Sequence, residues 1–371
     1  MPAPETFALI CGGGTAGHVL PAIAIGDALV ARGHTRESLH FVGSQGRIEA
    51  TLVPEAGYDV TLLPGRGIQR SLALANIGAL IGIVRAFVKA IGLLRQRRPR
   101  VVVAMGGFAS VPCGLAAVLW RVPIVVAEQN AVPGVANRLI ARFARACAVS
   151  FPDTPLPRAV VTGNPVRSEV LEIAARDDRE AAKRELGVAA DRALLLVTGG
   201  SLGARTLNVA VIDALSKWAD RMDLTVRHVV GERDWEEIVV ARPDLPALGV
   251  SYSPVRYERA MPVALRAADI AVCRAGSSTC FELFAAGLPA VLVPSPNVTG
   301  DHQSANARYV ASKGAAIVVA DAELDGARLV SEVDALLDDP ARRREMSAAA
   351  HSLATPHAAD DIASLVLQHA R

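Results

Sequence analysis

The sequence predicts an α/β protein of two doubly wound, Rossmann-like domains that face each other across a cleft. Three observations support this class. Apolar residues make up 51% of the 371 residues and aromatic residues only 4%, so Ala, Val, Leu and Ile must fill the interior, as in layered α/β proteins. Short apolar runs enter glycine-rich loops at several points along the chain. The length also fits two domains of roughly 150 residues each.

The first domain begins with the apolar run Phe7 to Cys11, which enters Gly12-Gly-Gly-Thr-Ala-Gly-His18. The run indicates a buried parallel strand rather than a signal peptide, because no basic residue precedes it. A helix is expected from about Ala22 to Arg32. Consecutive glycines let the backbone approach a ligand closely, and His18 lies where its side chain can point at that ligand. A dinucleotide-binding loop with an incidental His is the alternative, although the GxGxxG spacing is only loosely met.

The next part of the domain is apolar and basic. Strands are expected at His40 to Val42 and at Gly57 to Leu63, followed by a basic turn at Gly65-Arg-Gly67. Apolar residues then recur at helical spacing from Ile77 to Leu94. One interpretation is a helix packed on the sheet, and the other is a basic, apolar patch that lies on a membrane surface. Both can hold for different faces of the helix.

A second glycine loop, Met105 to Ser110, follows the strand Val101 to Ala104 and precedes an apolar helix. The strand Pro123 to Ala127 then ends at Glu128, Gln129 and Asn130, and Asn137 follows on the next helix. Polar residues at the carboxyl end of a strand mark the ligand edge of such a sheet. Further strands are expected at Ala146 to Ser150 and from Val160, and the turn Asn164-Pro165 predicts a first domain of residues 1–165.

The second domain, expected over residues 166–356, begins in the same way. A charged helix, Arg179 to Leu186, precedes the strand Ala193 to Val197, the third glycine loop Thr198 to Arg205 and the helix Thr206 to Leu215. Strands are expected at Leu224 to Val230 and from Val250 to Val255. The terminal segment, 357–371, is expected to form an amphipathic helix that packs back on the first domain.

The strongest local signal is the stretch Ile270 to Val293. A strand enters Arg274-Ala-Gly276, and a helix capped by the hydroxyl residues Ser277 to Thr279 is expected to end at Gly287. The free N–H groups and positive dipole of such a helix start suit a diphosphate. Glu282 lies one turn further on, where it can accept hydrogen bonds from sugar hydroxyls. An ordinary capped helix with a solvated Glu is the alternative.

A further motif follows this stretch. Asp301, His302 and Gln303 are expected to begin another helix at the same edge of the sheet.

Charge and composition exclude several classes of protein. The 39 basic and 37 acidic residues give a net charge of +2, so nucleic acid is not an expected partner. No acidic residue lies between Asp59 and Glu128, although nine basic residues do, and this region calls for an anionic partner. The five cysteines form no CxxC pair and indicate buried thiols, without a metal site. Without a GxxxxGK[ST] loop, group transfer from a nucleotide-activated donor fits better than ATP hydrolysis.

In order along the chain, these motifs resemble those of the MurG family of bacterial N-acetylglucosaminyl transferases. The resemblance is carried by Gly12 to His18, Met105 to Phe108, Glu128 to Gly134, Gly163 to Arg167, Gly199 to Arg205, Cys273 to Gly276 with Glu282, and Asp301 to Gln303. It implies the glycosyltransferase B fold and an inverting transfer of GlcNAc from UDP-GlcNAc to lipid I, which gives lipid II for peptidoglycan. It also implies a peripheral protein at the cytoplasmic face of the bacterial inner membrane, with lipid I, an anionic membrane surface and other cell-wall and division proteins as partners and with no cofactor.

The resemblance also assigns residues to the two substrates. The donor UDP-GlcNAc would contact Thr15, Ala16, Gly17, Asn130, Arg167, Ser201, Val255, Ser277, Ser278, Thr279, Glu282 and Gln303. The acceptor diphosphate would contact Gly13, Gly14, His18, Gly106, Gly107 and Asn137. A base must deprotonate the acceptor hydroxyl, and His18 and Glu128 are both candidates.

Three departures from the family pattern concern details of substrate binding. Ala127 stands where the family usually has His, and Ala16 stands in a loop usually richer in Gly. The third departure is a loop from Ser295 to Gly300 that is longer than usual, with Ser304 after it in place of a frequent second Gln. Two rival functions stay open at this point. One is a transferase of the same fold for another lipid or small-molecule acceptor, and the other is a non-catalytic scaffold that binds a nucleotide sugar.

Overall fold

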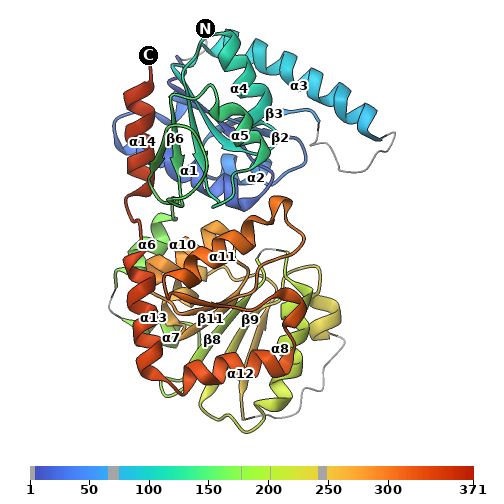
Figure 1. Ribbon diagram of the computed structural model, residues 1–371, viewed down its shortest axis with the longest axis vertical. Helices are drawn as coiled ribbons and strands as arrows, with labels where there is room; N and C mark the ends of the chain where they lie inside the picture. Colours follow the sequence, from blue (N-terminus) through green and yellow to red (C-terminus); the bar gives the residue numbers. More distant parts are fainter. Residues whose placement is uncertain (1–4, 66–74, 177, 201, 241–248) are drawn as a thin grey trace. The chain divides into compact units, whose positions relative to one another are not determined.

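The structure, a computed structural model, describes residues 5–65, 75–176, 178–200, 202–240 and 249–371. Internal contacts divide the chain into two compact units. Unit 1 comprises Met1–Arg167 and Thr355–Arg371, and unit 2 comprises Ser168–Ala354. The chain therefore leaves unit 1 and returns to it, so that its last helix belongs to the first unit (Figure 1).

Within the described ranges, unit 1 contains a seven-stranded parallel sheet in the order β3-β2-β1-β4-β5-β6-β7. Its strands are β1 (Ala8–Gly12), β2 (Leu39–Ser44), β3 (Asp59–Leu63), β4 (Val101–Gly106), β5 (Ile124–Glu128), β6 (Ala146–Val149) and β7 (Ala159–Val161). The chain winds outward from β1 in one direction and outward from β4 in the other. The adjacent strands β1 and β4 thus form a topological switch point, where ligands of such sheets bind.

The helices of unit 1 are α1 (Ala16–Ala31), α2 (Glu49–Glu55), α3 (Ala75–Arg97), α4 (Ser110–Leu119), α5 (Val135–Ala141) and α14 (Ala358–His369). The expected start of the first helix at Ala22 is wrong, because α1 already begins at Ala16 and includes Pro21. A proline inside a helix removes one backbone hydrogen bond. The helix nevertheless continues past Pro21 to Ala31. The helix α2 was not predicted at all.

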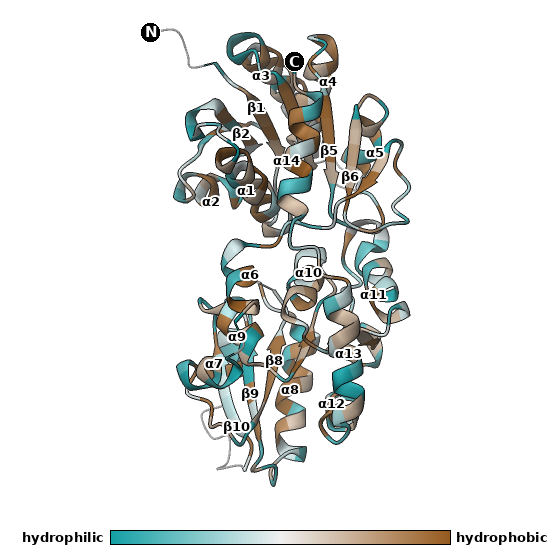
Figure 2. Cartoon of the chain, turned by 90° about the vertical axis from the view of Figure 1, so that its left-hand side faces the viewer, coloured by the Kyte–Doolittle hydropathy of each residue, from teal (hydrophilic) through white to brown (hydrophobic). Residues whose placement is uncertain are grey.

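Both faces of the unit 1 sheet are buried, which explains why its central strands are continuously apolar. Ile10 and Val103 lie on one face of the sheet and pack with α1. Leu9 and Val102 lie on the opposite face, in a second core cluster. α14 covers the same face as α1 with its buried residues Ile362, Ala363 and Val366. Figure 2 shows this arrangement as brown strands behind helices of mixed colour.

Unit 2 repeats the architecture with a six-stranded sheet in the order β10-β9-β8-β11-β12-β13, as counted over the residues that the structure describes. The strands are β8 (Ala193–Thr198), β9 (Leu224–Val229), β10 (Ser251–Val255), β11 (Ile270–Cys273), β12 (Ala290–Leu292) and β13 (Ala316–Val318). Neighbouring strands pair in parallel throughout this sheet. Its switch point lies between β8 and β11. The predicted class of two doubly wound α/β units is therefore confirmed.

The helices of unit 2 are α6 (Ser168–Ala174), α7 (Arg179–Glu185), α8 (Arg205–Lys217), α9 (Met261–Ala267), α10 (Ser277–Ala286), α11 (His302–Ser312), α12 (Gly326–Leu337) and α13 (Pro340–Ser352). The expected capping of α10 by its hydroxyl residues is wrong. Gly276 occupies the N-cap position, and Ser277, Ser278 and Thr279 form the first turn. Gly287 does end α10, in the left-handed conformation with φ 57°. The sequence did not predict α6, α9, α12, α13 or β13.

Two further features concern the helices and the cysteines. Within the described ranges, no helix has the length and apolar character needed to cross a bilayer. All five cysteines are buried free thiols, as predicted. Burial raises the pKa of Cys147 to about 11 and that of Cys280 to about 12, so these thiols stay protonated at neutral pH and are poor nucleophiles.

Candidate functional site

The switch point of unit 1 brings two glycine loops into contact. We call residues Gly12–Gly14, at the end of β1, loop 1, and residues Gly106–Gly107, at the end of β4, loop 2. A Cβ atom on Gly107 would lie 2.4 Å from the carbonyl oxygen of Gly13, and Gly107 has a φ of +77°. Only glycine satisfies both conditions without strain. The two loops predicted for the acceptor diphosphate therefore lie backbone against backbone.

His18 lies beside loop 2. Its Nδ1 is 3.1 Å from the hydroxyl oxygen of Thr15, the N-cap residue of α1. A Cβ atom on Gly106 would lie 3.2 Å from Nε2 of His18 and 3.3 Å from Nδ2 of Asn137. The structure thus brings His18, Asn137 and Gly106 together at the switch point. The ring nitrogen Nε2 is the one that faces loop 2.

Glu128, the other candidate base, is embedded in hydrogen bonds and only 3% exposed. Its Oε1 accepts from the backbone N–H and the side-chain amide of Asn130, at 2.9 and 3.3 Å. Its Oε2 accepts from the N–H of Gly134 at 3.0 Å and from Asn137 Nδ2 at 2.9 Å. Each oxygen of Glu128 therefore already has two hydrogen-bond donors within the protein. The geometry therefore makes Glu128 the anchor of the loop between β5 and α5.

A third carboxylate, which the sequence did not single out, lies against loop 1. Glu49, the first residue of α2, accepts a hydrogen bond from the N–H of Gly14 at 2.9 Å and another from the N–H of Ser44 at 2.8 Å. The Gly14 amide, one of the groups predicted to contact a diphosphate, is therefore already occupied.

The N-terminus of α1 lies at the same end of β1. This helix has neither a side-chain cap nor an acidic residue in its first turn, which leaves its N-terminus suited to an anion.

The switch point of unit 2 has the same design. The third glycine loop follows β8 and leads into α8, and the turn Arg274-Ala-Gly276 follows β11 and leads into α10. A Cβ atom on Gly203, whose φ is +76°, would lie 2.1 Å from the carbonyl oxygen of Val230. Neither α8 nor α10 has a side-chain cap or an acidic residue in its first turn. Two uncapped helix N-termini thus follow adjacent strands.

The start of α10 offers hydroxyl groups as well as backbone amides. Ser278 Oγ is buried and has no hydrogen-bond partner among the described residues. A buried hydroxyl without a partner costs free energy, and a ligand oxygen would satisfy it. Glu282 lies in the second turn of the same helix and is half-buried. Burial raises the pKa of Cys273 far above its ordinary value. The neighbouring Cys280 and the negative charge of Glu282 raise this pKa further.

Other side chains hold the loops around α10 in place. Arg274 forms an ion pair with Asp321 and donates to the carbonyl oxygen of Val293 at 3.1 Å. Asn306 is fully buried and its Nδ2 donates to the carbonyl oxygen of Ala275 at 3.1 Å. Gln303, a predicted donor ligand, accepts a hydrogen bond from the N–H of Ser295 at 2.8 Å through Oε1. One end of the Gln303 amide is therefore used to fix the loop after β12.

The residues predicted for the donor are divided between the units. Thr15, Ala16, Gly17, Asn130 and Arg167 belong to unit 1, whereas Val255, Ser277, Ser278, Thr279, Glu282 and Gln303 belong to unit 2. Ser201 lies outside the described residues, as do Arg66 and Gly67 of the predicted basic turn. Within unit 2, Ser277 to Glu282 share one helix, and Val255 ends β10 at the same carboxyl edge of the sheet.

Two family models match the chain, one for each unit. The glycosyltransferase family 28 N-terminal domain matches residues 8–149, and the glycosyltransferase family 28 C-terminal domain matches residues 194–363. Together they cover both sheets described above, with the exception of the edge strand β7.

Several curated proteins similar to this chain carry the name UDP-N-acetylglucosamine--N-acetylmuramyl-(pentapeptide) pyrophosphoryl-undecaprenol N-acetylglucosamine transferase. The chain is 41% identical to the protein of that name from Clavibacter sepedonicus, over 97% of this chain and 96% of the relative. It is 40% identical to the one from Salinibacter ruber, over 97% of this chain and 95% of the relative. Among solved structures, Acinetobacter baumannii MurG is similar with a TM-score of 0.77 and 27% identity, over 98% of this chain and 99% of that one.

Proposed function

Because this chain belongs to glycosyltransferase family 28, we propose that it transfers N-acetylglucosamine from UDP-N-acetylglucosamine to N-acetylmuramyl-(pentapeptide) pyrophosphoryl-undecaprenol, or lipid I. The product is lipid II, a precursor of peptidoglycan. The observation that carries the proposal is the near full-length identity with relatives of that name. The two doubly wound units agree with the glycosyltransferase B fold.

Unit 2 is the proposed donor unit. The uncapped N-terminus of α10, with the unpartnered Ser278 hydroxyl, supports the binding of the UDP diphosphate. In this proposal, Glu282 accepts hydrogen bonds from the ribose hydroxyls. The same positive helix end stabilises the charge that develops on UDP as it leaves. This stabilisation needs no metal ion, which is the expectation from the sequence.

Unit 1 is the proposed acceptor unit, with loops 1 and 2 and the N-terminus of α1 near the acceptor diphosphate. In the reaction, the acceptor hydroxyl oxygen forms a bond to C1 of GlcNAc while the bond from C1 to the phosphate oxygen of UDP breaks. Attack from the opposite side inverts the configuration at C1. The hydroxyl proton goes to a base, for which we propose His18 Nε2, because Glu128 is occupied by donors on both oxygens.

A transfer assay tests the proposed function. Purified protein is incubated with UDP-GlcNAc and a soluble lipid I analogue, and release of UDP is followed together with formation of the disaccharide product. We expect turnover that requires both substrates. Turnover with a sterol or macrolide acceptor in place of the lipid I analogue would favour the rival transferase. Binding of UDP-GlcNAc without turnover on any acceptor would favour the scaffold.

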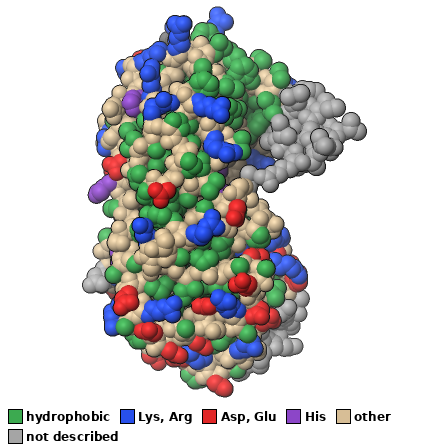
Figure 3. Space-filling view, in the orientation of Figure 1, with side chains coloured by type: hydrophobic (Ala, Val, Ile, Leu, Met, Phe, Trp, Pro, Cys, Tyr) green, Lys and Arg blue, Asp and Glu red, His purple; other side chains and the backbone are tan. Residues whose placement is uncertain are grey.

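We further propose that unit 1 associates with an anionic membrane surface. The helix α3 exposes the apolar residues Val84 and Val88, which are 56% and 63% exposed, on a helix with many basic residues. α3 packs on α4, whose end borders an open hollow of about 820 Å³. The hollow is lined by Arg121, Arg142, Phe143, Arg145 and Arg158 among others. On the face in Figure 3, basic side chains predominate over unit 1, whereas both signs mix over unit 2.

Charge reversal in the hollow provides the test of this association. Replacing Arg142 and Arg145 by Glu is expected to weaken binding to vesicles of anionic phospholipid roughly tenfold or more, since each basic residue near such a surface contributes about 1 kcal/mol. Wild-type binding should also weaken as salt increases. The matched control reverses the exposed Arg342 and Arg344 of α13 in unit 2 and should bind as the wild type does. Salt-independent binding, or equal loss in both variants, would contradict the proposal.

A further inference from the structure

Glu49 is a buried carboxylate whose charge is compensated by backbone amides alone. It is 1% exposed and forms no ion pair with any described basic side chain. Burying an ionised group is costly unless hydrogen bonds compensate it. Here the two oxygens have separate partners, Oε2 with the Gly14 N–H and Oε1 with the Ser44 N–H. The carboxylate therefore ties loop 1 to the end of the neighbouring strand β2.

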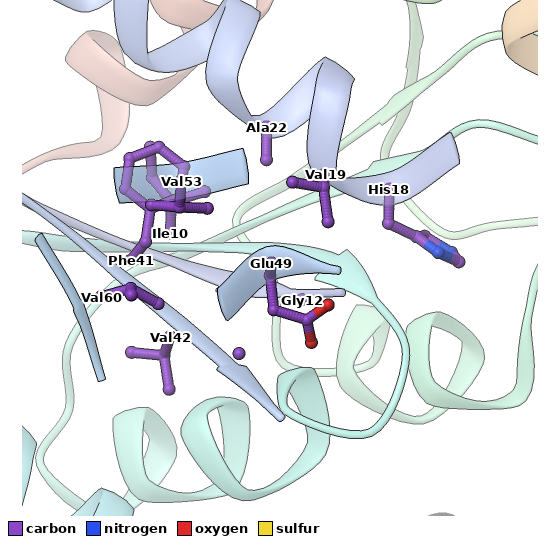
Figure 4. Close-up of a pocket in the computed structure, with 11 residues that line it drawn as sticks. Ile10, Gly12, His18, Val19, Ala22, Phe41, Val42, Glu49, Val53 and Val60 are labelled. Carbon is purple, nitrogen blue, oxygen red and sulfur yellow. The ribbon is translucent and has the colours of Figure 1, made fainter. Parts of the chain in front are cut away.

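Two glycines create the space that the carboxylate fills. A Cβ atom on Gly13 would lie 2.3 Å from Glu49 Oε1, and a Cβ atom on Gly43 would lie 2.3 Å from Glu49 Cγ. Any other residue type at either position would displace the carboxylate from its amides. Figure 4 shows the side chain of Glu49 directed to the side of the pocket where Gly12 and His18 lie, away from the apolar residues Ile10, Phe41 and Val53. Glu49, Gly13 and Gly43 thus form one interlocking set.

The contacts of Glu49 continue to His18 through two consecutive residues, Gly14 and Thr15. Glu49 holds the amide of Gly14, which adopts a φ of +96° and immediately precedes Thr15. Thr15 is the N-cap residue of α1, and its hydroxyl oxygen pairs with Nδ1 of His18. A hydrogen bond at Nδ1 fixes the orientation of the imidazole ring and thus the direction of Nε2. The position of loop 1 therefore determines the position of the ring.

From these contacts we propose that Glu49 is a positioning residue, which fixes loop 1 and through it orients His18 for deprotonation of the acceptor. The proposal rests on the function proposed above. Glu49 acts without touching substrate, because it is buried behind the loop. Displacement of a catalytic group by about 1 Å can lower a rate roughly 100-fold. The effect of losing the carboxylate should therefore fall on kcat more than on donor binding.

The test compares Glu49→Gln with Glu55→Gln, which changes an exposed carboxylate on the same helix. Glutamine keeps the shape of the side chain but has one acceptor oxygen, so its NH2 group must face one of the two N–H donors. We expect Glu49→Gln to lower kcat by a factor of roughly 10–100, with the KM for UDP-GlcNAc within about twofold. Glu55→Gln should change neither. Assays are run well below the unfolding midpoint of each variant, so that loss of folded protein does not contribute.

A second readout does not depend on turnover. NMR spectra of protein with labelled histidine side chains report the environment of the His18 ring, and amide hydrogen exchange reports the Gly14 and Ser44 N–H groups. In Glu49→Gln we expect shifted His18 ring signals and faster exchange at one or both amides, with no change in Glu55→Gln. Unchanged His18 signals, or an unchanged kcat, would overturn the positioning role. If the wild type transfers no GlcNAc, the function proposed above fails, and the His18 signals still decide whether Glu49 orients the ring.

Discussion

Replacing His18 by Ala is expected to lower kcat for GlcNAc transfer by a factor of roughly 10² to 10⁴, the usual contribution of a general base. The acceptor hydroxyl is a weak nucleophile, and the bond to C1 forms readily only as its proton leaves. Nε2 of His18 faces loop 2, and Nδ1 is held by Thr15, so the ring is oriented for this task. The KM for UDP-GlcNAc should change much less, because the groups proposed to bind the diphosphate and ribose belong to unit 2.

Two further variants make this result specific. His357→Ala removes an exposed histidine of unit 1 and should leave kcat unchanged. Glu128→Gln should lower the thermal stability of the protein, because the NH2 group replaces one oxygen and two of the four hydrogen bonds become contacts between two donors. If His18→Ala keeps more than a tenth of kcat while Glu128→Gln loses 100-fold at full folding, then Glu128 is the base and our assignment is wrong.

Replacing Glu282 by Ala is expected to raise the KM for UDP-GlcNAc by a factor of roughly 10–100 and to change kcat little. The proposed role of this carboxylate is to accept hydrogen bonds from ribose hydroxyls. Hydrogen bonds to a charged group contribute about 1.5–3 kcal/mol, and 1.4 kcal/mol corresponds to a factor of ten. The ribose lies away from the reacting C1, so the contact is equally strong in the ground state and the transition state.

Steady-state kinetics with varied UDP-GlcNAc, together with calorimetric titration of UDP, measure this effect. The control is Glu345→Ala on α13, an exposed position of unit 2, which should leave both constants unchanged. A KM for UDP-GlcNAc within twofold of the wild type in Glu282→Ala would remove Glu282 from the donor site. A fall in kcat with an unchanged KM would instead place it near the reacting atoms.

The sequence was sufficient to predict the glycine loops and all strands but β13, because these depend on local signals. Runs such as Val101 to Ala104 are apolar without interruption, as strands buried on both faces must be, and glycines follow them where backbones approach closely. The start of α1 at Ala16 was missed because Gly17 and Pro21 both have low helix propensity. The tertiary packing of α1 on the sheet, through Val19, Ala22 and Ile25, outweighs that propensity.

The roles of the three carboxylates could not be predicted to the same extent. The sequence alone suggests a ligand-binding role for Glu282, because this residue lies near the start of α10. Glu128 was placed correctly at the ligand edge, but its partner Asn137 is nine residues away and becomes visible only in the folded chain. Glu49 meets Gly14 across 35 residues, and neither residue carries a local signal for the other. Long-range hydrogen bonds of this kind depend on the sheet order, which brings β1 and β2 together.

The return of the chain to unit 1 has a consequence for the order in which the protein folds during synthesis. Unit 2 is a single continuous segment and is complete once Ala354 has left the ribosome. Unit 1 is made first but lacks α14 until the end, so Ile362, Ala363 and Val366 are missing from its core while unit 2 folds. An unfinished hydrophobic surface of this kind is prone to aggregation. Unit 1 is therefore made first, but it can complete its hydrophobic core only after all of unit 2 has been made.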